Sequence, residues 1–150
     1  MQADNFEINP YTEVYRQQLL TIWEKSVLAT HDFLTSVDFE EIKEFVSNVD
    51  FRDFNIFCLT KGNLVLGFIG VVDKKVEVLF LDPEYFGQGF GQRLLNFAVK
   101  ELNADKLDVN EQNTKALKFY QKFGFEIFER TEKDDQGRNY PLLRMKLARE

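Results

Sequence analysis

The sequence predicts an α/β (α+β) fold in which helices pack on one mixed β-sheet. Helical periodicity and β-rich apolar runs alternate along the chain in the order β-α-α-β-β-β-α-β-α-β-β. The 150 residues contain no internal repeat, low-complexity tract or linker, and this length suits one compact domain. We therefore expect a single domain that spans residues 1–150.

The first third of the chain is expected to hold a short strand and two helices. An apolar start lies at residues 6–8, and the segment 9–30 has apolar side chains at roughly 3.6-residue spacing. These are Val14, Leu19, Ile22, Trp23, Val27 and Leu28. Asp38 is a candidate N-cap for a second helix. The apolar positions of that helix are Ile42, Phe45 and Val46.

Three β-rich runs fill the centre of the chain: NIFCLT, LVLGFIGVV and VEVLFLD. The segments 61–63 and 73–75, which read Lys-Gly-Asn and Asp-Lys-Lys, separate these runs and have the composition of hairpin turns. Cys58 lies inside the first run and is expected to be a small buried core residue.

The last third alternates helices and strands. The residues after the glycine-rich loop form one helical stripe, namely Leu94, Leu95, Ala98, Val99 and Leu102. KLDVN (106–110) reads as a strand, and residues 113–124 as a helix that Gly124 closes. The inward face of that helix would be Ala116, Phe119, Tyr120 and Phe123. FEIFERT and YPLLRMKL form a final hairpin, and the charged run 130–138 is expected to be its solvated tip.

Composition and charge exclude several classes of protein. The net charge of −6 argues against a nucleic-acid partner, whereas it suits a cationic ligand such as an amine. The longest uncharged apolar stretch, Leu64–Val72, is too short to span a membrane, and the first ten residues lack the pattern of a secretory signal. One Cys and one His argue against a disulfide framework and a structural metal site. We expect a cytoplasmic protein, either a monomer or a homodimer.

Three of the eight glycines, Gly87, Gly89 and Gly91, crowd just ahead of an amphipathic helix. Glycines allow positive φ and remove the Cβ atoms that hold a ligand away from the backbone. The N-terminus of a helix presents unpaired N–H groups and a partial positive charge. Together these features predict an anion cradle, normally one for phosphate. The simpler interpretation is a tight strand-to-helix turn without a ligand.

Other phosphate-binding motifs fit this loop less well. A P-loop requires a Gly-Lys pair, which the chain lacks, and the third glycine of a dinucleotide fingerprint would fall on Gln92. Asp108 does lie at the distance expected of a ribose ligand. However, the preceding strand ends a run of hairpin-like strands and does not open a βαβ unit. A nucleotide-binding or dinucleotide-binding enzyme is thus a weaker hypothesis.

The residues 76–95 and 107–126 resemble the two core motifs of the GNAT acetyltransferase superfamily. The loop of that family, Arg/Gln-x-x-Gly-x-Gly/Ala, is similar to residues 86–91, with Phe86 at the position that usually holds Arg or Gln. Gln88 and Arg93 are candidates to replace that contact. The second motif, Asn-x-x-Ala-x-x-Phe-Tyr-x-x-x-Gly-Phe, is matched by Asn113, Ala116, Phe119, Tyr120, Gly124 and Phe125. The resemblance implies a mostly antiparallel sheet with a splayed strand pair and helices on both faces.

The resemblance also implies acetyl-CoA, without a metal, as the acyl donor. Backbone N–H groups of the loop would bind the pyrophosphate, and the splayed strand would pair with the pantetheine arm. The implied contact residues are Leu79, Phe80, Leu81, Phe86, Gly87, Gln88, Gly89, Phe90, Gly91, Gln92, Asn113 and Tyr120. Asn113 also has the position of a helix N-cap. The acceptor would be a primary amine of a small molecule or a peptide.

Acetylation of an amine requires a base and a group that stabilises the departing thiolate. An alkyl ammonium has a pKa of about 10.4, so only about one molecule in a thousand is nucleophilic at neutral pH. Glu77, a carboxylate in an apolar strand that shares alternation with Leu79 and Leu81, is a candidate base, and the alternative is an exposed residue paired with a Lys. His31 is the other candidate base, although a lone His is more often structural.

Tyr120 is the candidate proton donor to the thiolate, because the matching tyrosine of the family points toward the cofactor sulfur. Its alternative role is that of a core aromatic residue. Trp23, His31 and Phe33 are candidates for the acceptor pocket. We favour direct acetyl transfer within a ternary complex, and the alternative is a non-catalytic module that binds acyl-CoA on the same fold.

Overall fold

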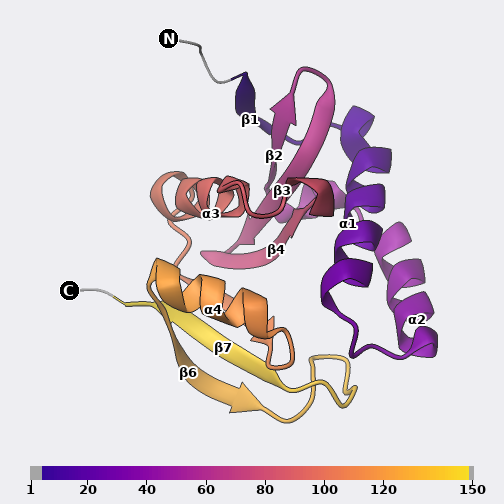
Figure 1. Ribbon diagram of the computed structural model, residues 1–150, viewed down its shortest axis with the longest axis vertical. Coiled ribbons are helices and arrows are strands. Elements are labelled where there is room, and N and C mark those ends of the chain that lie inside the picture. Colours follow the sequence, from indigo (N-terminus) through magenta and orange to yellow (C-terminus); the bar gives the residue numbers. More distant parts are fainter. Residues whose placement is uncertain (1–4, 149–150) are drawn as a thin grey trace.

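The computed structural model describes residues 5–148 and confirms the expected order of elements (Figure 1). The strands are β1 (Phe6–Pro10), β2 (Ile56–Lys61), β3 (Leu64–Val72), β4 (Lys75–Leu81), β5 (Lys106–Asn110), β6 (Phe125–Thr131) and β7 (Leu142–Leu147). The helices are α1 (Arg16–Thr30), α2 (Ser36–Ser47), α3 (Phe90–Glu101) and α4 (Thr114–Phe123), with short 3-10 turns η1 (Glu13–Tyr15), η2 (Phe51–Phe54) and η3 (Pro83–Tyr85). Within this range, no helix combines the length and the apolar character needed to cross a membrane.

The strands form one mixed sheet in the order β1-β2-β3-β4-β5-β7-β6. Every neighbouring pair is antiparallel except β4 and β5. These two parallel strands pair only through Lys75 with Lys106 and Val76 with Leu107, whereas β5 pairs along its whole length with β7. Beyond Val76, β4 therefore diverges from β5, and the expected splayed strand pair is confirmed.

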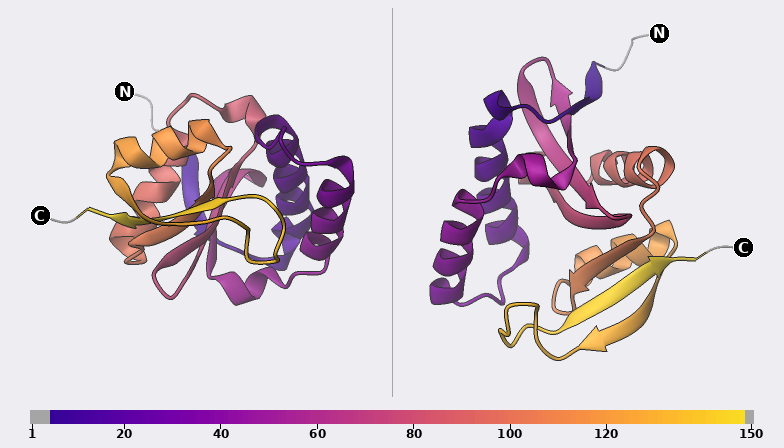
Figure 2. Two further views of the ribbon diagram at one scale, coloured as in Figure 1. Left: turned by 90° about the horizontal axis from the view of Figure 1, so that it is seen from below. Right: turned by 180° about the vertical axis from the view of Figure 1, so that it is seen from behind.

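Helices cover both faces of the sheet, as Figure 2 shows. Helices α3 and α4 pack against one face, where Leu94, Leu95 and Ala98 of α3 are fully buried. Helices α1 and α2 lie against the other face, where Leu19 and Ile22 of α1 are buried in a second cluster. The sheet thus separates an α3–α4 side from an α1–α2 side, and this division decides what each side of the splay can bind.

A β-bulge interrupts β4 at Glu77. Val76 pairs with Val71 of β3 and Val78 pairs with Gly70, so Glu77 has no partner residue on β3. A bulge of this kind bends the strand and breaks the alternation of side chains. The bend occurs directly after the last residue of β4 that pairs with β5, so the bulge lies where the two strands begin to part.

The bulge also changes which side chains of β4 share a face. Val76 packs in the α3–α4 core together with Leu79 and Leu81, whereas Val78 packs on the α1–α2 side. Regular alternation would have placed Val76 and Val78 on one face. VEVLFL is apolar at every position except Glu77, so the sequence contains no sign of this change.

Three expectations for the N-terminal helices are wrong in detail. Val14 is 84% exposed because it belongs to the 3-10 turn η1, outside the periodicity of α1, and Leu28 is exposed on the outer side of α1. The N-cap of α2 is Thr35, whose side chain accepts a hydrogen bond from the backbone N–H of Asp38. Asp38 therefore lies inside the first turn of α2, and its carboxylate is available for contacts elsewhere. Phe45 is also exposed, on the outer side of α2.

Candidate active site

The outer edge of β4 is open along the segment predicted to bind pantetheine. Leu79, Phe80 and Leu81 pair with β3 on one side. On the other side, β5 has already diverged, so among residues 5–148 no strand pairs with them. Strand backbones carry hydrogen-bonding groups on both edges. This part of β4 therefore presents unpaired backbone groups, and an amide-containing chain can pair with them as a further strand would.

The glycine-rich loop leads from this edge to the N-terminus of α3. Gly87 and Gly89 have φ values of +78° and +84°, and a Cβ atom on either would meet no heavy atom within 4 Å. Gly89 is the N-cap of α3, and no side chain caps the helix. The first N–H groups of α3, from Phe90 onward, thus face an open space lined by bare backbone, which is the geometry of an anion cradle.

Gly91 differs from the other two glycines. It lies in the first turn of α3 with an ordinary helical φ, and its Cβ position is 3.6 Å from the ring of Phe119. The third glycine therefore brings α3 close to α4 but is not required by the backbone. The three glycines thus meet two different requirements: Gly87 and Gly89 allow a positive φ, and Gly91 allows α3 to lie close to α4.

The position that usually carries Arg or Gln in the family is an exposed aromatic residue. Phe86 ends the turn η3 and is 42% exposed. Arg93 was one candidate to replace the missing polar contact, but its Nη2 donates to the carbonyl oxygen of Phe6, 2.9 Å away in β1. The guanidinium of Arg93 is thus engaged with β1, and Gln88 is the remaining candidate.

Tyr120 combines a buried ring with an available hydroxyl. The ring packs edge-on against Phe119 and Phe125, with centroids 5.3 and 6.2 Å away. Among the described residues, the hydroxyl has no hydrogen-bond partner. Every fully buried side-chain nitrogen or oxygen in this part of the chain does have one, so the hydroxyl oxygen of Tyr120 must reach solvent. Burial of the side chain raises the pKa of Tyr120 to about 12. The phenol is therefore neutral at physiological pH and has a proton to donate.

Asn113 performs the capping role expected of it. Its side-chain oxygen accepts a hydrogen bond from the N–H of Ala116, 3.3 Å away, at the start of α4. Its own N–H donates to the carbonyl oxygen of Asn110. The capping bond uses only the oxygen of the side-chain amide, so the NH₂ group is free to donate to a ligand.

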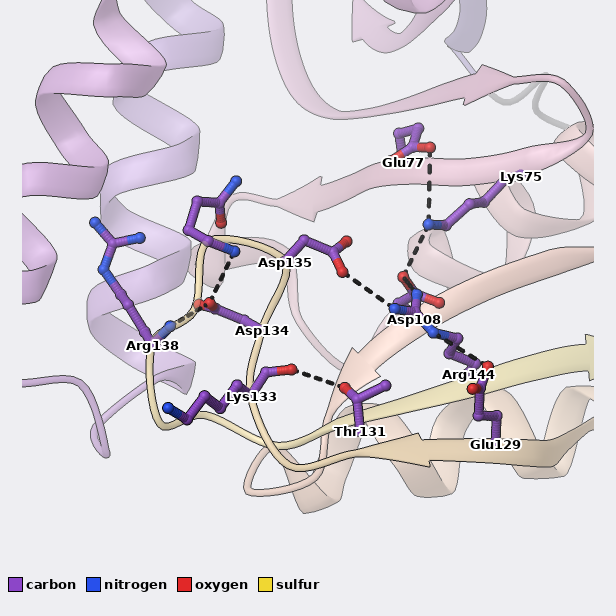
Figure 3. A network of polar contacts seen from close by, with 11 residues as sticks. Lys75, Glu77, Asp108, Glu129, Thr131, Lys133, Asp134, Asp135, Arg138 and Arg144 are labelled. Carbon is purple, nitrogen blue, oxygen red and sulfur yellow. Dashed lines mark hydrogen bonds and ion pairs between the residues drawn. The ribbon is translucent and has the colours of Figure 1, made fainter.

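Glu77 does not lie where alternation placed it. Its carboxylate is 3.9 Å from the ammonium of Lys75, which in turn meets Asp108 on the face opposite the α3–α4 core (Figure 3). The expected grouping with Leu79 and Leu81 is therefore wrong, because the bulge turns Glu77 to the α1–α2 side. The contacts of Glu77 match the alternative interpretation, in which it is an exposed residue paired with a Lys.

His31 lies at the C-terminal end of α1, and its neighbours determine its tautomer. The Thr30 hydroxyl donates its one proton to the carbonyl oxygen of Ser26 and lies 2.7 Å from Nδ1 of His31. Nδ1 must therefore carry the ring proton, which leaves a lone pair on Nε2. Burial lowers the pKa of His31, and the Asp32 charge opposes this shift only in part. The imidazole is thus neutral near pH 7.

The two aromatic candidates for the acceptor pocket have different surroundings. Trp23 is buried and stacks on Phe39 of α2 at 5.8 Å between centroids. Phe33 lies in the α1–α2 loop, where its ring contacts His31 on one side and Tyr140 on the other. His31 and Phe33 thus form one aromatic row with Tyr140, a residue that the sequence did not indicate.

A polar groove of about 240 Å³ opens on the α1–α2 side, at the point where β4 and β5 part. Its lining residues are Lys75, Val76, Glu77, Asp108, Asn110, Asp134, Asp135, Gln136 and Leu142. Of these, Glu77 was predicted as a site residue, and Asp108 was considered only as a ribose ligand in the weaker dinucleotide hypothesis. The alternation of KLDVN offered one further sign, because Asp108 and Asn110 fall on the face opposite the buried Leu107 and Val109. Among residues 5–148, no group of three or more His, Cys, Asp or Glu side chains could hold a metal ion.

Asp108 is not available as a ribose ligand. Its Oδ2 atom accepts hydrogen bonds from Lys75 Nζ and Arg144 Nη1, each at 2.8 Å (Figure 3). Lys75 and Arg144 come from β4 and β7, the two neighbours of β5 in the sheet, so the Asp108 carboxylate joins β4, β5 and β7. This structural role removes the observation that had favoured a dinucleotide site.

Comparison with known proteins agrees with this arrangement. The family model described as "Acetyltransferase (GNAT) domain" matches residues 52–127. Peptidyl-lysine N-acetyltransferase YjaB of Salmonella typhimurium is 38% identical over 129 residues, which are 86% of this chain and 89% of that protein. The solution structure of apo-form YjaB from Escherichia coli has a TM-score of 0.88 and 31% identity, and the match covers 97% of this chain and 99% of that one.

A more distant likeness extends to a protein solved with a ligand. PaiA N-acetyltransferase from Thermoplasma acidophilum, in complex with coenzyme A, has a TM-score of 0.64 and 21% identity, covering 94% of this chain and 98% of that one. At this identity the likeness concerns the fold. The family match, the relatives and the splayed sheet agree, and the chain belongs to the GNAT family of acetyltransferases.

Proposed function

We propose that this protein transfers the acetyl group of acetyl-CoA to the side-chain amine of a lysine in a peptide or protein, by direct attack in a ternary complex. The observation that carries this proposal is the continuous open surface formed by the free edge of β4 and the uncapped N-terminus of α3. The peptidyl-lysine acceptor is inferred from the similarity to YjaB.

The residues present fit the proposed donor. Loop N–H groups around Gly89 and the first turn of α3 would hold the pyrophosphate, with Gln88 beside them. The open edge of β4 at Leu79–Leu81 would pair with the amides of the pantetheine arm. Bound acetyl-CoA supplies a thioester, the acyl donor of the reaction. The side-chain NH₂ of Asn113 is a further donor at the start of α4.

The acceptor would enter from the groove on the opposite face. Helices α3 and α4 occupy the other face of the sheet, so the groove gives the approach to the splay from the α1–α2 side. A lysine ammonium must lose a proton before it attacks, which costs about 4 kcal/mol at neutral pH for a pKa of about 10.4. Glu77 borders the groove and is the proposed proton acceptor, acting through solvent. His31, with its lone pair on Nε2, is the second candidate.

Tyr120 is the proposed partner of the departing sulfur. A thiol has a pKa of about 8.5, so complete transfer from a phenol with a pKa of about 12 is uphill by about 5 kcal/mol. We therefore assign Tyr120 mainly a hydrogen bond to the developing thiolate, because a preorganised donor stabilises the charge without giving up its proton.

A titration and an assay together test the proposed function. Acetyl-CoA is titrated into the protein in a calorimeter, with ATP and NADH as controls, and turnover is measured on a peptide with a single lysine and blocked ends. Selective acetyl-CoA binding with turnover is expected. Binding without turnover on a broad panel of amines would favour a non-catalytic acyl-CoA-binding module, and binding of only NADH or ATP would favour a nucleotide enzyme.

A further inference from the structure

We propose that Tyr140 is a positioning residue for the acceptor, because it fixes the β6–β7 connection (residues 132–141) as one wall of the groove. The proposal rests on the proposed function above. The sequence predicted a solvated hairpin tip at residues 130–138, and most of these residues are indeed exposed, but nothing in the sequence indicated that the connection is attached to α2. Three of the groove-lining residues, 134–136, belong to this connection.

The contacts of Tyr140 bind the connection to α2. The side chain is buried, at 8% exposure, and its hydroxyl donates to a carboxylate oxygen of Asp38. The same hydroxyl accepts a hydrogen bond of 3.3 Å from the N–H of Thr35, the N-cap of α2. The Tyr140 ring packs on Phe33. One side chain thus joins the connection to the start of α2 and to the loop that precedes it.

Arg138 strengthens the same attachment. Its Nε lies 3.7 Å from the Asp38 carboxylate, and its Nη2 donates to Glu41 of α2 at 3.1 Å. Asp38 therefore accepts a hydrogen bond from Tyr140 and forms an ion pair with Arg138. We name these three residues, Asp38, Arg138 and Tyr140, the α2 latch.

The other end of the connection is held to the sheet. Asp134 accepts hydrogen bonds from the N–H groups of Gln136 and Arg138, which closes a tight turn (Figure 3). Asp135 pairs with Arg144 of β7 at 3.1 Å, and Arg144 in turn meets Asp108. The connection is thus fixed at both ends, with the groove-lining residues 134–136 between the α2 latch and the sheet.

The charges of the groove fit a cationic acceptor. Four carboxylates, from Glu77, Asp108, Asp134 and Asp135, line the groove together with the ammonium of Lys75, and the guanidinium of Arg144 pairs with two of them, so the carboxylates outnumber these cations by two. Two of the four belong to the connection. Their position relative to β4 depends on the α2 latch, so the latch sets the shape and the charge of the surface that an incoming lysine meets.

The test is the substitution Tyr140→Phe, which removes the hydroxyl and keeps the ring against Phe33. Loss of a hydrogen bond to a charged group corresponds to about a tenfold change. We expect the KM for the single-lysine peptide to rise about tenfold, while kcat and the Kd of acetyl-CoA each change less than about twofold. A role limited to stability would lower the melting temperature and leave this KM unchanged.

The chain provides a matched control. The Tyr11 hydroxyl also donates to a carboxylate, that of Glu13, in an exposed region outside the groove. Tyr11→Phe should leave all three kinetic values unchanged. Asp38→Asn is the second variant: it keeps an acceptor for Tyr140 but loses the charge, so the peptide KM should rise by less than in Tyr140→Phe.

The outcomes separate this proposal from the proposed function. If the wild-type protein acetylates the peptide and neither Tyr140→Phe nor Asp38→Asn raises its KM above that of Tyr11→Phe, the positioning role is overturned and the proposed function stands. A fall in kcat with an unchanged KM also overturns it. If the wild-type protein neither binds acetyl-CoA nor acetylates any peptide, the proposed function fails and the positioning role fails with it. If Tyr140→Phe does not fold, Asp38→Asn decides.

Discussion

Lys75 and Asp108 form an ion pair of 2.8 Å between β4 and β5, one residue before the two strands part. Arg144 of β7 reaches the same carboxylate oxygen. All three side chains are at least partly buried, with exposures of 27%, 16% and 24%. A carboxylate that is shielded in this way and meets two cations holds the sheet together at the base of the splay.

Asp108→Asn should destabilise the protein, because it removes the one carboxylate that two partly buried cations share. We expect a loss of about 2 kcal/mol in the free energy of unfolding, measured by urea denaturation. Glu111→Gln is the matched control, since Glu111 pairs with Arg130 in an exposed bridge, and exposed bridges contribute little. Equal effects of the two changes would refute the special role of Asp108.

Tyr120→Phe should lower kcat about a hundredfold with little change in the Kd of acetyl-CoA, because a hydrogen bond to the developing thiolate acts in the transition state. Stopped assays with a lysine peptide and calorimetry with acetyl-CoA measure the two values. The pKa of about 12 also predicts that no loss of activity below pH 10 comes from ionisation of this residue. Unchanged turnover would remove Tyr120 from the mechanism.

Gly89→Ala should weaken acetyl-CoA binding about tenfold. Alanine at a positive φ costs about 1–2 kcal/mol, and its methyl group would enter the open space in front of α3. Gly91→Ala is the control, because Gly91 has an ordinary helical φ and its Cβ would make only van der Waals contact with Phe119. Calorimetric titration of both variants measures the difference, and similar affinities would argue against a cradle at Gly89.

Phe86→Arg should tighten acetyl-CoA binding about fivefold to tenfold, because a charge-assisted hydrogen bond to phosphate contributes about 1.5 kcal/mol or more. The gain should shrink as salt is added, since salt screens an exposed charge pair. Phe86→Leu is the control that removes the ring without adding a charge. A similar gain with leucine would show that the charge is not responsible.

His31 should make stability depend on pH. Its pKa is lower in the folded protein than in the unfolded chain, so the unfolded chain binds more protons around pH 6. Stability therefore falls as the pH drops below the unfolded pKa of about 6.5. His31→Gln should lose this part of the pH dependence, which unfolding curves between about pH 5 and 8 would measure. Parallel curves for the two proteins would contradict a buried neutral imidazole.

Local patterns predicted most of the fold. The apolar stripe of α3 and the turn at residues 73–75 each depend on a few neighbouring residues, and the structure agrees with both; Asp73 and Lys74 have the positive φ values of a tight hairpin turn. The bulge at Glu77 was not visible, because it arises from the pairing of β4 with β3, and the apolar residues that follow Glu77 suit either face of the sheet.

The open loop ahead of α3 was predictable from the sequence, whereas most of the groove was not. Gly87, Gly89 and Tyr120 belong to short motifs whose spacing is local. The groove depends on contacts between distant segments: Tyr140 meets Asp38 across 102 positions, and Arg144 meets Asp108 across 36. No periodicity or motif reports such contacts, so the sequence indicated the solvated tip at 130–138 but not its attachment to α2.

The short pairing of β4 with β5 has a mechanical consequence. Two residue pairs join these strands, against six between β3 and β4. The sheet of residues 5–148 therefore consists of two well-paired halves, β1–β4 and β5–β7–β6, whose strands are joined only by the short pairing at Lys75–Lys106 and Val76–Leu107. We expect bending of the sheet to concentrate at this joint, and an acyl donor bound between the two halves, as proposed above, would make them move together.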